Sequence, residues 1–485
     1  MLRLARRAPL LWLCLGGAAL RFATLAQQSL WFDEAATARL MRMGLGAMLR
    51  ALPDAESTPP LYYLLAWLWT RLFGTGEVGL RSLSAVFGTL TIAVVYAAGA
   101  RLFGRRAGLA AAALAAFSPL LIWYSQEARA YALLVALAAA GLWALAAALE
   151  PGSGRRAPLV WAVVCALALT THYFAVFVVV PQAVWLLRAR GRAAAPAVAG
   201  VVLAGCGLLP LALHQRAQGG ADFIARSPLA TRLAQAAKQF LIGYDTPGQV
   251  ALAVLAALLL AGSAWSLLRG PAGPVRGHAV GLAAIAGAAV AVPVVLALLG
   301  LDYVITRNLI GAWVPAALAV AAGGALAGVR AGPALVAAAC VLGLAATLGI
   351  ALDARYQRDD WRGAARTVPP GSTTALVVTP PSGRLPLAYY LPASRALPVA
   401  GAAVTTVEVI GLAGRGVGAP LRAPAVPPAP PALAGFTAPV VRRGDTFSML
   451  RYRASGPAVV VTPATLAPLA LAGGGPATLL LDGSG

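Results

Sequence analysis

The chain is dominated by apolar stretches long enough to cross a lipid bilayer, separated by short connections that carry arginine. A membrane-spanning helix needs about 17–25 mostly apolar residues. Single stretches of this kind lie at 8–26, 80–101, 107–124, 131–149, 195–213, 250–268, 279–300, 309–328 and 333–352, and 158–187 holds two short spans that meet at Thr171-His172-Tyr173. The sequence therefore predicts an all-α polytopic membrane protein with about 11 transmembrane helices.

Composition supports the same interpretation. Of 485 residues, 60% are hydrophobic and only 11% are charged, whereas a soluble domain is usually about 25% charged. The net charge of +22 is spread over short arginine clusters between apolar stretches, which fits contact with anionic lipid headgroups. This dispersal excludes a nucleic-acid-binding protein, and the bilayer is the expected partner.

The charges also predict an orientation. With the N-terminus in the cytoplasm, every short inner connection is basic, as the positive-inside rule requires. These connections carry Arg105-Arg106, Arg155-Arg156, Arg188/Arg190/Arg192, Arg269/Arg276 and Arg330. Of the sixteen acidic residues, only Glu150 then falls inside. We therefore expect a multi-pass protein of the inner (plasma) membrane whose C-terminal domain is extracytoplasmic.

Two domains are predicted, a transmembrane domain at 1–352 and a small α/β domain at 353–485. Asp360-Trp361-Arg362 is typical of a helix start, Thr374–Val378 of a strand, and Leu387–Leu391 is interpreted as a second strand. Pro and Gly dominate after about residue 411, which predicts partial disorder there. The segment 61–73 is too short to span and is expected to lie at the membrane interface, with Tyr62 at headgroup level.

The loop after the first span carries an acidic pair, Asp33-Glu34, directly after Trp31-Phe32. One interpretation is simple helix-start acids favoured by the helix dipole. The other makes Asp33 a general base whose ionisation is tuned by a site shielded by lipid and aromatic rings.

A second cluster runs from Trp123 to Tyr131 after the third span. Glu127 and Tyr131 are four residues apart and so share a helix face, while Arg129 points elsewhere. The cluster is either an interfacial belt of solvated and anchoring side chains or a polar wall facing Asp33 across a cavity.

Two further polar residues stand at the ends of spans. His172, at a helix break, is either a structural hydrogen-bonding group or part of the site, and Arg307 either extends to headgroups or binds a lipid phosphate. There is no phosphate-binding glycine loop, Ser/His/Asp set or HExxH motif, so no nucleotide cofactor is expected.

These segments together resemble the GT-C membrane glycosyltransferases, specifically the glycosyltransferase family 39 type, which includes protein O-mannosyltransferases and aminoarabinose transferases. The motifs that carry the resemblance are Trp31-Phe32-Asp33-Glu34, Pro59-Pro60-Leu61-Tyr62-Tyr63, Gly79-Leu80-Arg81-Ser82-Leu83-Ser84, Ser125-Gln126-Glu127-Ala128-Arg129-Ala130-Tyr131 and Thr171-His172-Tyr173. It covers roughly residues 8–330, and the C-terminal domain only through Asp360-Trp361-Arg362.

The resemblance implies inverting transfer of a sugar from a polyprenyl-phosphate donor to an acceptor protein, lipid or glycan. It assigns Asp33 as the catalytic base, and Arg307 and Arg129, helped by His172, to the leaving phosphate. Glu34 and Glu127 would orient hydroxyl groups or hold a divalent cation, and Tyr62 and Tyr131 complete the substrate-binding set. Metal dependence stays open, because relatives differ in it. Thr58 replaces a histidine that many relatives carry, which puts any role of that histidine in doubt.

Two other function classes compete with the enzyme. A transporter or flippase of a lipid-linked glycan would need charged residues within the membrane and symmetry-related broken helices, and the predicted spans are nearly free of charge. An assembly or sensor protein would fit residues 353–485 but leaves the outer acidic residues unexplained.

Overall fold

The computed structural model describes residues 2–370, 372–412, 419–471 and 477–483. The chain divides into two compact units. The first comprises Met1–Leu25 and Met43–Leu348, and the second comprises Ala26–Arg42 and Gly349–Gly485. The predicted boundary at 352 is close to the observed one, but the sequence did not indicate that residues 26–42 belong with the C-terminal unit.

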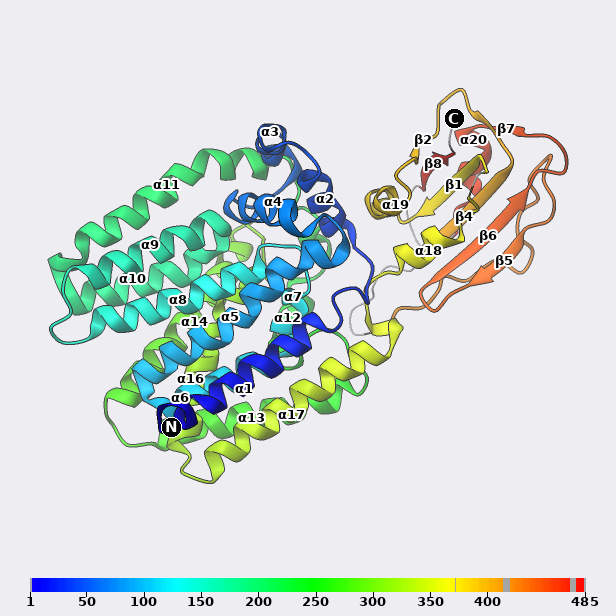
Figure 1. Cartoon of the computed structure of the whole chain (residues 1–485). Helices are drawn as coiled ribbons and strands as arrows, with labels where there is room; N and C mark the ends of the chain where they lie inside the picture. The colour runs from blue at the N-terminus through cyan, green and yellow to red at the C-terminus, as the bar shows by residue number, and fades with distance from the viewer. Residues whose placement is uncertain (1, 371, 413–418, 472–476, 484–485) are drawn as a thin grey trace. The chain divides into compact units, whose positions relative to one another are not determined.

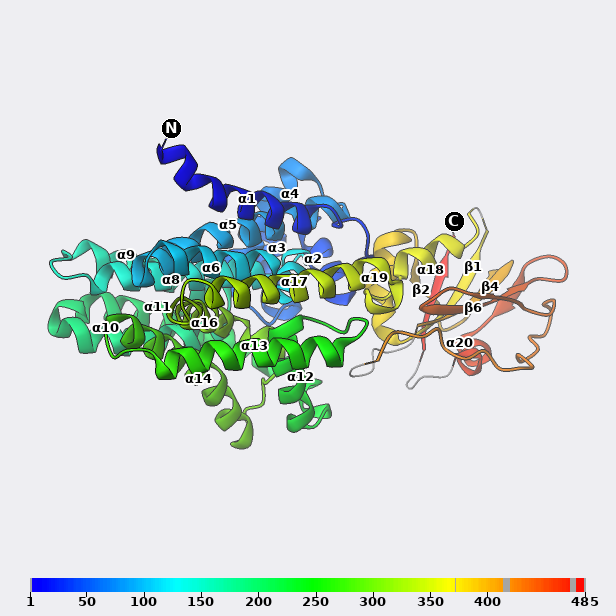
Figure 2. The same ribbon diagram turned by 90° about the horizontal axis from the view of Figure 1, so that it is seen from below.

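The first unit is a helical bundle (Figures 1 and 2). Every predicted apolar stretch contains a helix, and α4 (Leu61–Phe73) matches the predicted segment 61–73. The long helices are α1 (Leu2–Phe22), α5 (Glu77–Phe103), α6 (Arg105–Phe117), α8 (Tyr131–Leu149), α9 (Arg156–Thr171), α10 (Val176–Arg190), α11 (Ala195–Ala217), α13 (Gln249–Arg269), α14 (Pro274–Leu298), α16 (Trp313–Leu326) and α17 (Ala331–Leu352). Shorter helices are α3 (Leu45–Ala55), α7 (Pro119–Ser125), α12 (Leu229–Ile242) and α15 (Thr306–Leu309).

The protein is a multi-pass membrane protein, but the number of spans differs from the prediction. Within the described residues, seven helices are long and apolar enough to cross a membrane, or eight if α6 and α7 form one bent span. One of the seven, Tyr173–Ala217, contains both α10 and α11. The apolar parts of α1 and α9 are shorter, at Ala8–Phe22 and Arg156–Thr171. The predicted count of about 11 is therefore not confirmed.

The predicted span 107–124 is broken at Ser118, where α6 and α7 meet at an angle of 58°. Pro119 has no backbone N–H, so the carbonyl of Ala115 loses its helical donor. The guanidinium of Arg21, which is fully buried, donates instead to the carbonyls of Ala115 (2.9 Å) and Ala116 (3.1 Å). The first span thus contains a buried charge, and this charge stabilises the bend.

The second unit is built on a six-stranded sheet with the order β2-β8-β1-β4-β6-β5. The strands are β1 (Thr374–Thr379), β2 (Arg395–Ala396), β4 (Thr406–Leu412), β5 (Val440–Arg443), β6 (Phe447–Arg453) and β8 (Thr478–Asp482), and β3 (Ala402–Val404) pairs with β7 (Val459–Val461). Strand β1 is parallel to β4 and antiparallel to β8. Helices α18 (Trp361–Thr367) and α19 (Arg384–Tyr390) cover one face, where Trp361 and Leu387 pack on Leu376 and Ile410 (Figure 1).

Two predictions for this unit are confirmed and one is wrong. Asp360 caps α18 by accepting from the N–H of Gly363 (2.8 Å), and β1 contains the predicted strand. Leu387–Leu391, however, lies largely in helix α19, because an apolar run of five residues does not distinguish helix from strand. The stretch after 411, for which partial disorder is predicted, contains strands β5 to β8, and apolar residues of β6, β7 and β8 pack in the sheet core. Residues 413–418 and 472–476, which the disorder prediction includes, lie outside the described residues.

Candidate functional site

Arg129 is the centre of a buried polar cluster in the first unit. One nitrogen of its guanidinium donates to both carboxylate oxygens of Glu56 at 2.8 Å, and both side chains are under 10% exposed. The Tyr63 ring lies 6.0 Å below the guanidinium, and its hydroxyl bonds Thr58 Oγ1 at 3.1 Å. Thr58 thus has a structural role in this cluster.

Tyr62 joins the same cluster from α4. Its hydroxyl lies 3.4 Å from Ser84 Oγ of α5, and Ser84 in turn donates to the backbone carbonyl of Arg129 at 3.3 Å. Tyr62 is fully buried. The predicted residues Tyr62 and Arg129, more than sixty positions apart in sequence, are therefore connected through one hydroxyl group.

Glu127 lies in the turn between α7 and α8, not on a helix. The prediction that Glu127 and Tyr131 share a helix face is wrong, because α7 ends at Ser125 and α8 begins at Tyr131. The Glu127 carboxylate accepts from the indole N–H of Trp123 at 3.1 Å, and the neighbouring Gln126 donates to the carbonyls of Leu20 and Arg21 at the end of α1. These bonds fix the turn that carries Glu127.

A series of aromatic contacts connects this turn with the segment before α15. Ring centroids are 4.4 Å apart for Trp123–Tyr244, 4.9 Å for Tyr124–Tyr131, 5.7 Å for Tyr131–His172, 5.4 Å for His172–Phe174 and 5.6 Å for Phe174–Tyr303. The predicted site residues Tyr131 and His172 thus contact each other directly.

Arg307 is positioned by the end of the same series. Its neighbour Asn308 donates to the carbonyl of Tyr303 at 2.8 Å, and its own guanidinium lies 5.5 Å from the ring centre of Phe223. Arg232 of α12 holds the preceding loop through Asp302 (2.8 Å) and the carbonyl of Val304 (2.7 Å). Arg307, in the short helix α15, therefore follows a loop that these bonds hold.

His172 is buried between α9 and α10, and its Nδ1 accepts from the N–H of Phe174 at 3.3 Å. Burial, together with the positive charges of Arg129 and Arg307, lowers the pKa of His172 from 6.5 to about 3. The ring is therefore neutral near pH 7. Its electrostatic dependence on both arginines also shows that the three predicted residues share one region.

This pKa predicts a pH dependence of stability. Below about pH 6.5 the unfolded chain binds a proton at His172, whereas the folded chain does not. The free energy of unfolding therefore has its full value above pH 6.5 and decreases as the pH falls toward 3. In detergent, we expect the unfolding midpoint of the wild type to drop more steeply between pH 6.5 and 5 than that of His172→Gln. Equal slopes would contradict this account of the histidine.

Asp33 and Glu34 lie in the second unit, in the first turn of α2 (Phe32–Met41). This placement confirms the predicted helix start. Asp33 is partly exposed, whereas Glu34 is fully buried with Arg358 at 3.8 Å. Asp33 thus belongs to a different unit from Glu127, Arg129, Tyr131, His172 and Arg307.

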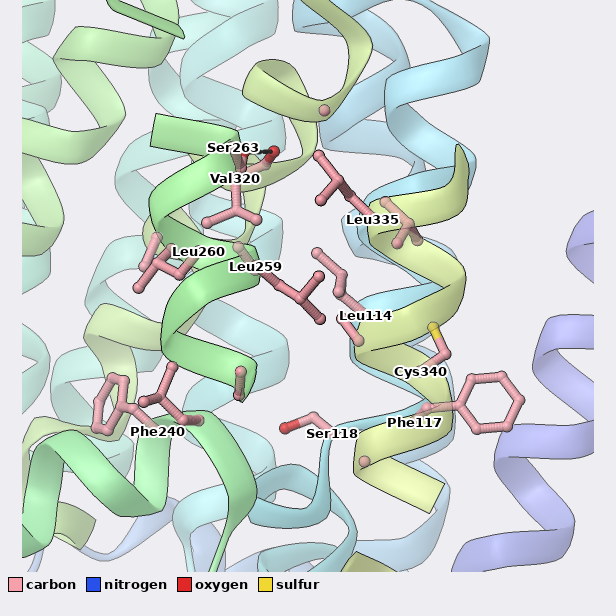
Figure 3. A pocket seen from close by; sticks show the side chains of 18 of the residues that line it. Leu114, Phe117, Ser118, Phe240, Leu259, Leu260, Ser263, Val320, Leu335 and Cys340 are labelled. Atoms are coloured by element: carbon pink, nitrogen blue, oxygen red, sulfur yellow. Dashed lines mark hydrogen bonds between the residues drawn. The ribbon is translucent and has the colours of Figure 1, made fainter. Parts of the chain in front are cut away.

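An apolar cavity of 190 Å³ lies between α6, α12, α13, α16 and α17. In Figure 3, Leu114, Leu259 and Leu335 extend into the space between these helices. Ser263, also on the wall, donates to the carbonyl of Val320 at 2.7 Å and is satisfied internally. Such a cavity suits a hydrocarbon ligand better than a polar one.

Lys238 of α12 precedes the cavity residue Phe240 by two positions and is the only lysine among 38 basic residues. Its ammonium group is bonded to Asp245 and donates to Gln249 Oε1 at 2.8 Å. Phe240 and Leu241, two and three residues further along α12, line the cavity. Gln249 and the cavity residue Ala256 are seven positions apart on α13. They therefore lie on the same face of the helix, separated by about 10 Å along its axis.

Sequence reasoning did not select Glu56, Lys238 or Arg21. Lys238 could have been selected because it is the single lysine in an arginine-rich chain, and Arg21 because it is a charged residue near the end of an apolar stretch. Glu56 had no comparable signal, because its partner Arg129 is 73 positions away. Within the described residues, no three His, Cys, Asp or Glu side chains are close enough to hold a metal ion.

Comparison with known proteins supports the resemblance found in the motifs. Residues 57–213 match the family described as dolichyl-phosphate-mannose-protein mannosyltransferase. This region includes Tyr62, Glu127, Arg129, Tyr131 and His172. No protein with a curated description matches the chain.

Two solved structures share the fold over nearly the whole chain. The structure of ArnT from Cupriavidus metallidurans bound to undecaprenyl phosphate has a TM-score of 0.55 and 14% identity, and it covers 93% of this chain and 99% of its own. The apo structure of the same protein has a TM-score of 0.54 and 15% identity, with 89% and 96% covered. The chain thus matches a mannosyltransferase family over residues 57–213 and shares the fold of ArnT over most of its length.

Proposed function

We propose that the chain is a membrane glycosyltransferase that moves a sugar from a polyprenyl-phosphate donor to an acceptor on the extracytoplasmic side, with inversion at the sugar carbon. The observation that carries the proposal is the family match over 57–213, because it contains Arg129 and the cluster residues Thr58, Tyr62 and Tyr63. The ArnT-like fold supports it. ArnT itself has been crystallised with undecaprenyl phosphate, a lipid phosphate of the expected donor class.

In the proposed reaction Asp33 accepts the proton of the acceptor hydroxyl. The acceptor oxygen then attacks the anomeric carbon while the bond from that carbon to the phosphate oxygen breaks, and polyprenyl phosphate leaves. The leaving group needs positive charge more than it needs a proton. Arg307 and Arg129 supply that charge, Glu127 orients sugar hydroxyls, and Tyr62, Tyr131 and neutral His172 complete the pocket wall. Glu34 supports Asp33 from the adjacent position.

The donor also has a long apolar tail, and the cavity between α6, α12, α13, α16 and α17 has the matching chemistry. We assign the tail to this cavity. Lys238 stands near it and carries the charge that a lipid phosphate requires, provided that the phosphate displaces the Asp245 carboxylate. A cation beside an apolar cavity suits an anionic lipid.

Lys238→Met is therefore expected to raise the KM for the donor by about tenfold or more, the effect of losing one charge-assisted hydrogen bond, with a small effect on kcat. Arg216→Met, which removes an exposed cation at the end of α11, serves as the control and leaves KM unchanged. Steady-state transfer assays with varied donor measure both constants. If the KM for the donor is unchanged in Lys238→Met, Lys238 is not part of the donor site.

The proposal is tested by incubating the purified protein with a panel of polyprenyl-phosphate sugars and measuring released polyprenyl phosphate. We expect release with one member of the panel, and only when an acceptor is present. A transporter or flippase would instead move the intact lipid-linked sugar between the leaflets of proteoliposomes. Flipping without any release would favour that second function.

A further inference from the structure

Residues 26–42, which we call the Asp33 segment, follow α1 in the sequence but belong to the second unit. We call the rest of that unit, residues 349–485, the C-terminal unit. At its start, Arg362 donates to the carbonyls of Ala26 (2.9 Å) and Gln27 (2.7 Å). Gln28 Oε1 accepts from the backbone N–H of Arg358 at 3.0 Å. Residues 26–28 are thus bonded to Arg358 and to Arg362 of α18, more than 300 positions later in the chain.

The contacts continue up to the helix that carries Asp33. Ser29 Oγ accepts from the N–H of Trp361 at 3.1 Å and donates to the carbonyl of Asp359. The N–H of Leu30 donates to the Tyr390 hydroxyl of α19 at 2.7 Å. The Ser29 hydroxyl and the Leu30 N–H are therefore bonded to residues 359–390.

Helix α2 is oriented by a buried ion pair. Glu34 is 0% exposed and its carboxylate lies 3.8 Å from Arg358, which is 7% exposed. Thr37, Ala38 and Met41 are buried along with Glu34, whereas Asp33 is partly exposed. Because neighbouring residues on a helix are about 100° apart, fixing Glu34 in the interior fixes the direction of Asp33.

We propose that the C-terminal unit is a positioning device for the catalytic base, in which Arg358, acting through Glu34, sets the orientation of α2 and Tyr390 sets the segment before it. The inference rests on the proposed function of Asp33. A base must be held within about 0.5 Å and 10–20° of its productive position, and a misplacement of about 1 Å costs about 100-fold in rate. A connection of seventeen residues without these contacts cannot meet that tolerance.

The test compares kcat and KM for sugar transfer by the full-length protein in proteoliposomes. Arg358→Ala is expected to lower kcat about 10- to 100-fold and to change the KM for donor less than about twofold. Arg358→Lys restores most of kcat, because the cation remains. The double variant Glu34→Gln/Arg358→Ala is expected to have the same kcat as the slower of the two single variants. Both substitutions remove the same interaction, so their effects do not add. The control is Arg355→Ala, whose guanidinium pairs with Asp353 in its own turn.

The outcomes separate this inference from the proposed function. If Asp33→Asn abolishes transfer while Arg358→Ala keeps kcat within twofold, the positioning role is overturned and the function stands. If Asp33→Asn remains active, the function itself fails. Should Arg358→Ala not fold, Tyr390→Phe removes a single hydroxyl and is expected to lower kcat about threefold or more. A wild-type kcat for Tyr390→Phe would then overturn the inference.

Discussion

Asp33→Asn is expected to lower the rate of sugar transfer by about 100-fold or more, the usual contribution of a positioned general base. Asparagine has the size of aspartate but does not accept a proton near pH 7. Asp33 is partly exposed in the first turn of α2, so the change leaves the fold and membrane insertion intact. The measurement is release of polyprenyl phosphate per molecule of inserted protein.

The matched control is Asp222→Asn. Asp222 is an exposed acidic residue of the first unit, in the connection between α11 and α12. Its substitution makes the same change of charge and is expected to leave the rate within about twofold of the wild type. If Asp33→Asn keeps a similar rate to this control, Asp33 is not the base.

Glu56→Gln is expected to destabilise the protein by about 3–5 kcal/mol, because it leaves the buried guanidinium of Arg129 without its anion. The glutamine has the same shape and can still accept hydrogen bonds, so the effect isolates the charge. Thermal unfolding of the purified protein in detergent measures it as a fall in the midpoint temperature.

An exposed ion pair provides the comparison for this prediction. Arg101 and Glu150 form a hydrogen-bonded pair at 2.6 Å, but their side chains are 31% and 50% exposed. Glu150→Gln is expected to cost less than about 1 kcal/mol, because solvent screens the pair. Equal midpoints for Glu56→Gln and Glu150→Gln would show that the Arg129 cluster does not stabilise the fold.

Local features of this chain were predictable from its sequence because they depend on neighbouring residues. The apolar stretches gave helices, and Asp360 gave a helix cap, since both follow from composition and spacing over a few residues. The strand prediction for 387–391 was wrong because it also used only neighbouring residues, and five apolar residues fit either a strand or a helix.

The pairing of distant residues was not predictable. Glu56 and Arg129, or Glu34 and Arg358, are joined only by the tertiary fold, and neither residue of a pair carries a local sign of its partner. Motif order grouped Arg129, Tyr131 and His172 in one predicted site, and the rings of Tyr131 and His172 are 5.7 Å apart. Motifs could not show that Asp33 is held by the C-terminal unit, because that unit resembles the family only faintly.

In the proposed reaction, the protein breaks the bond between a sugar and a polyprenyl phosphate and forms a new glycosidic bond with inverted configuration. The most direct measurement follows one turnover of a donor labelled in both the sugar and the lipid, and determines the anomeric configuration of the product by NMR. We predict equal amounts of released polyprenyl phosphate and transferred sugar, with the configuration opposite to that of the donor. Retained configuration, or recovery of the intact donor from every incubation, would contradict the account.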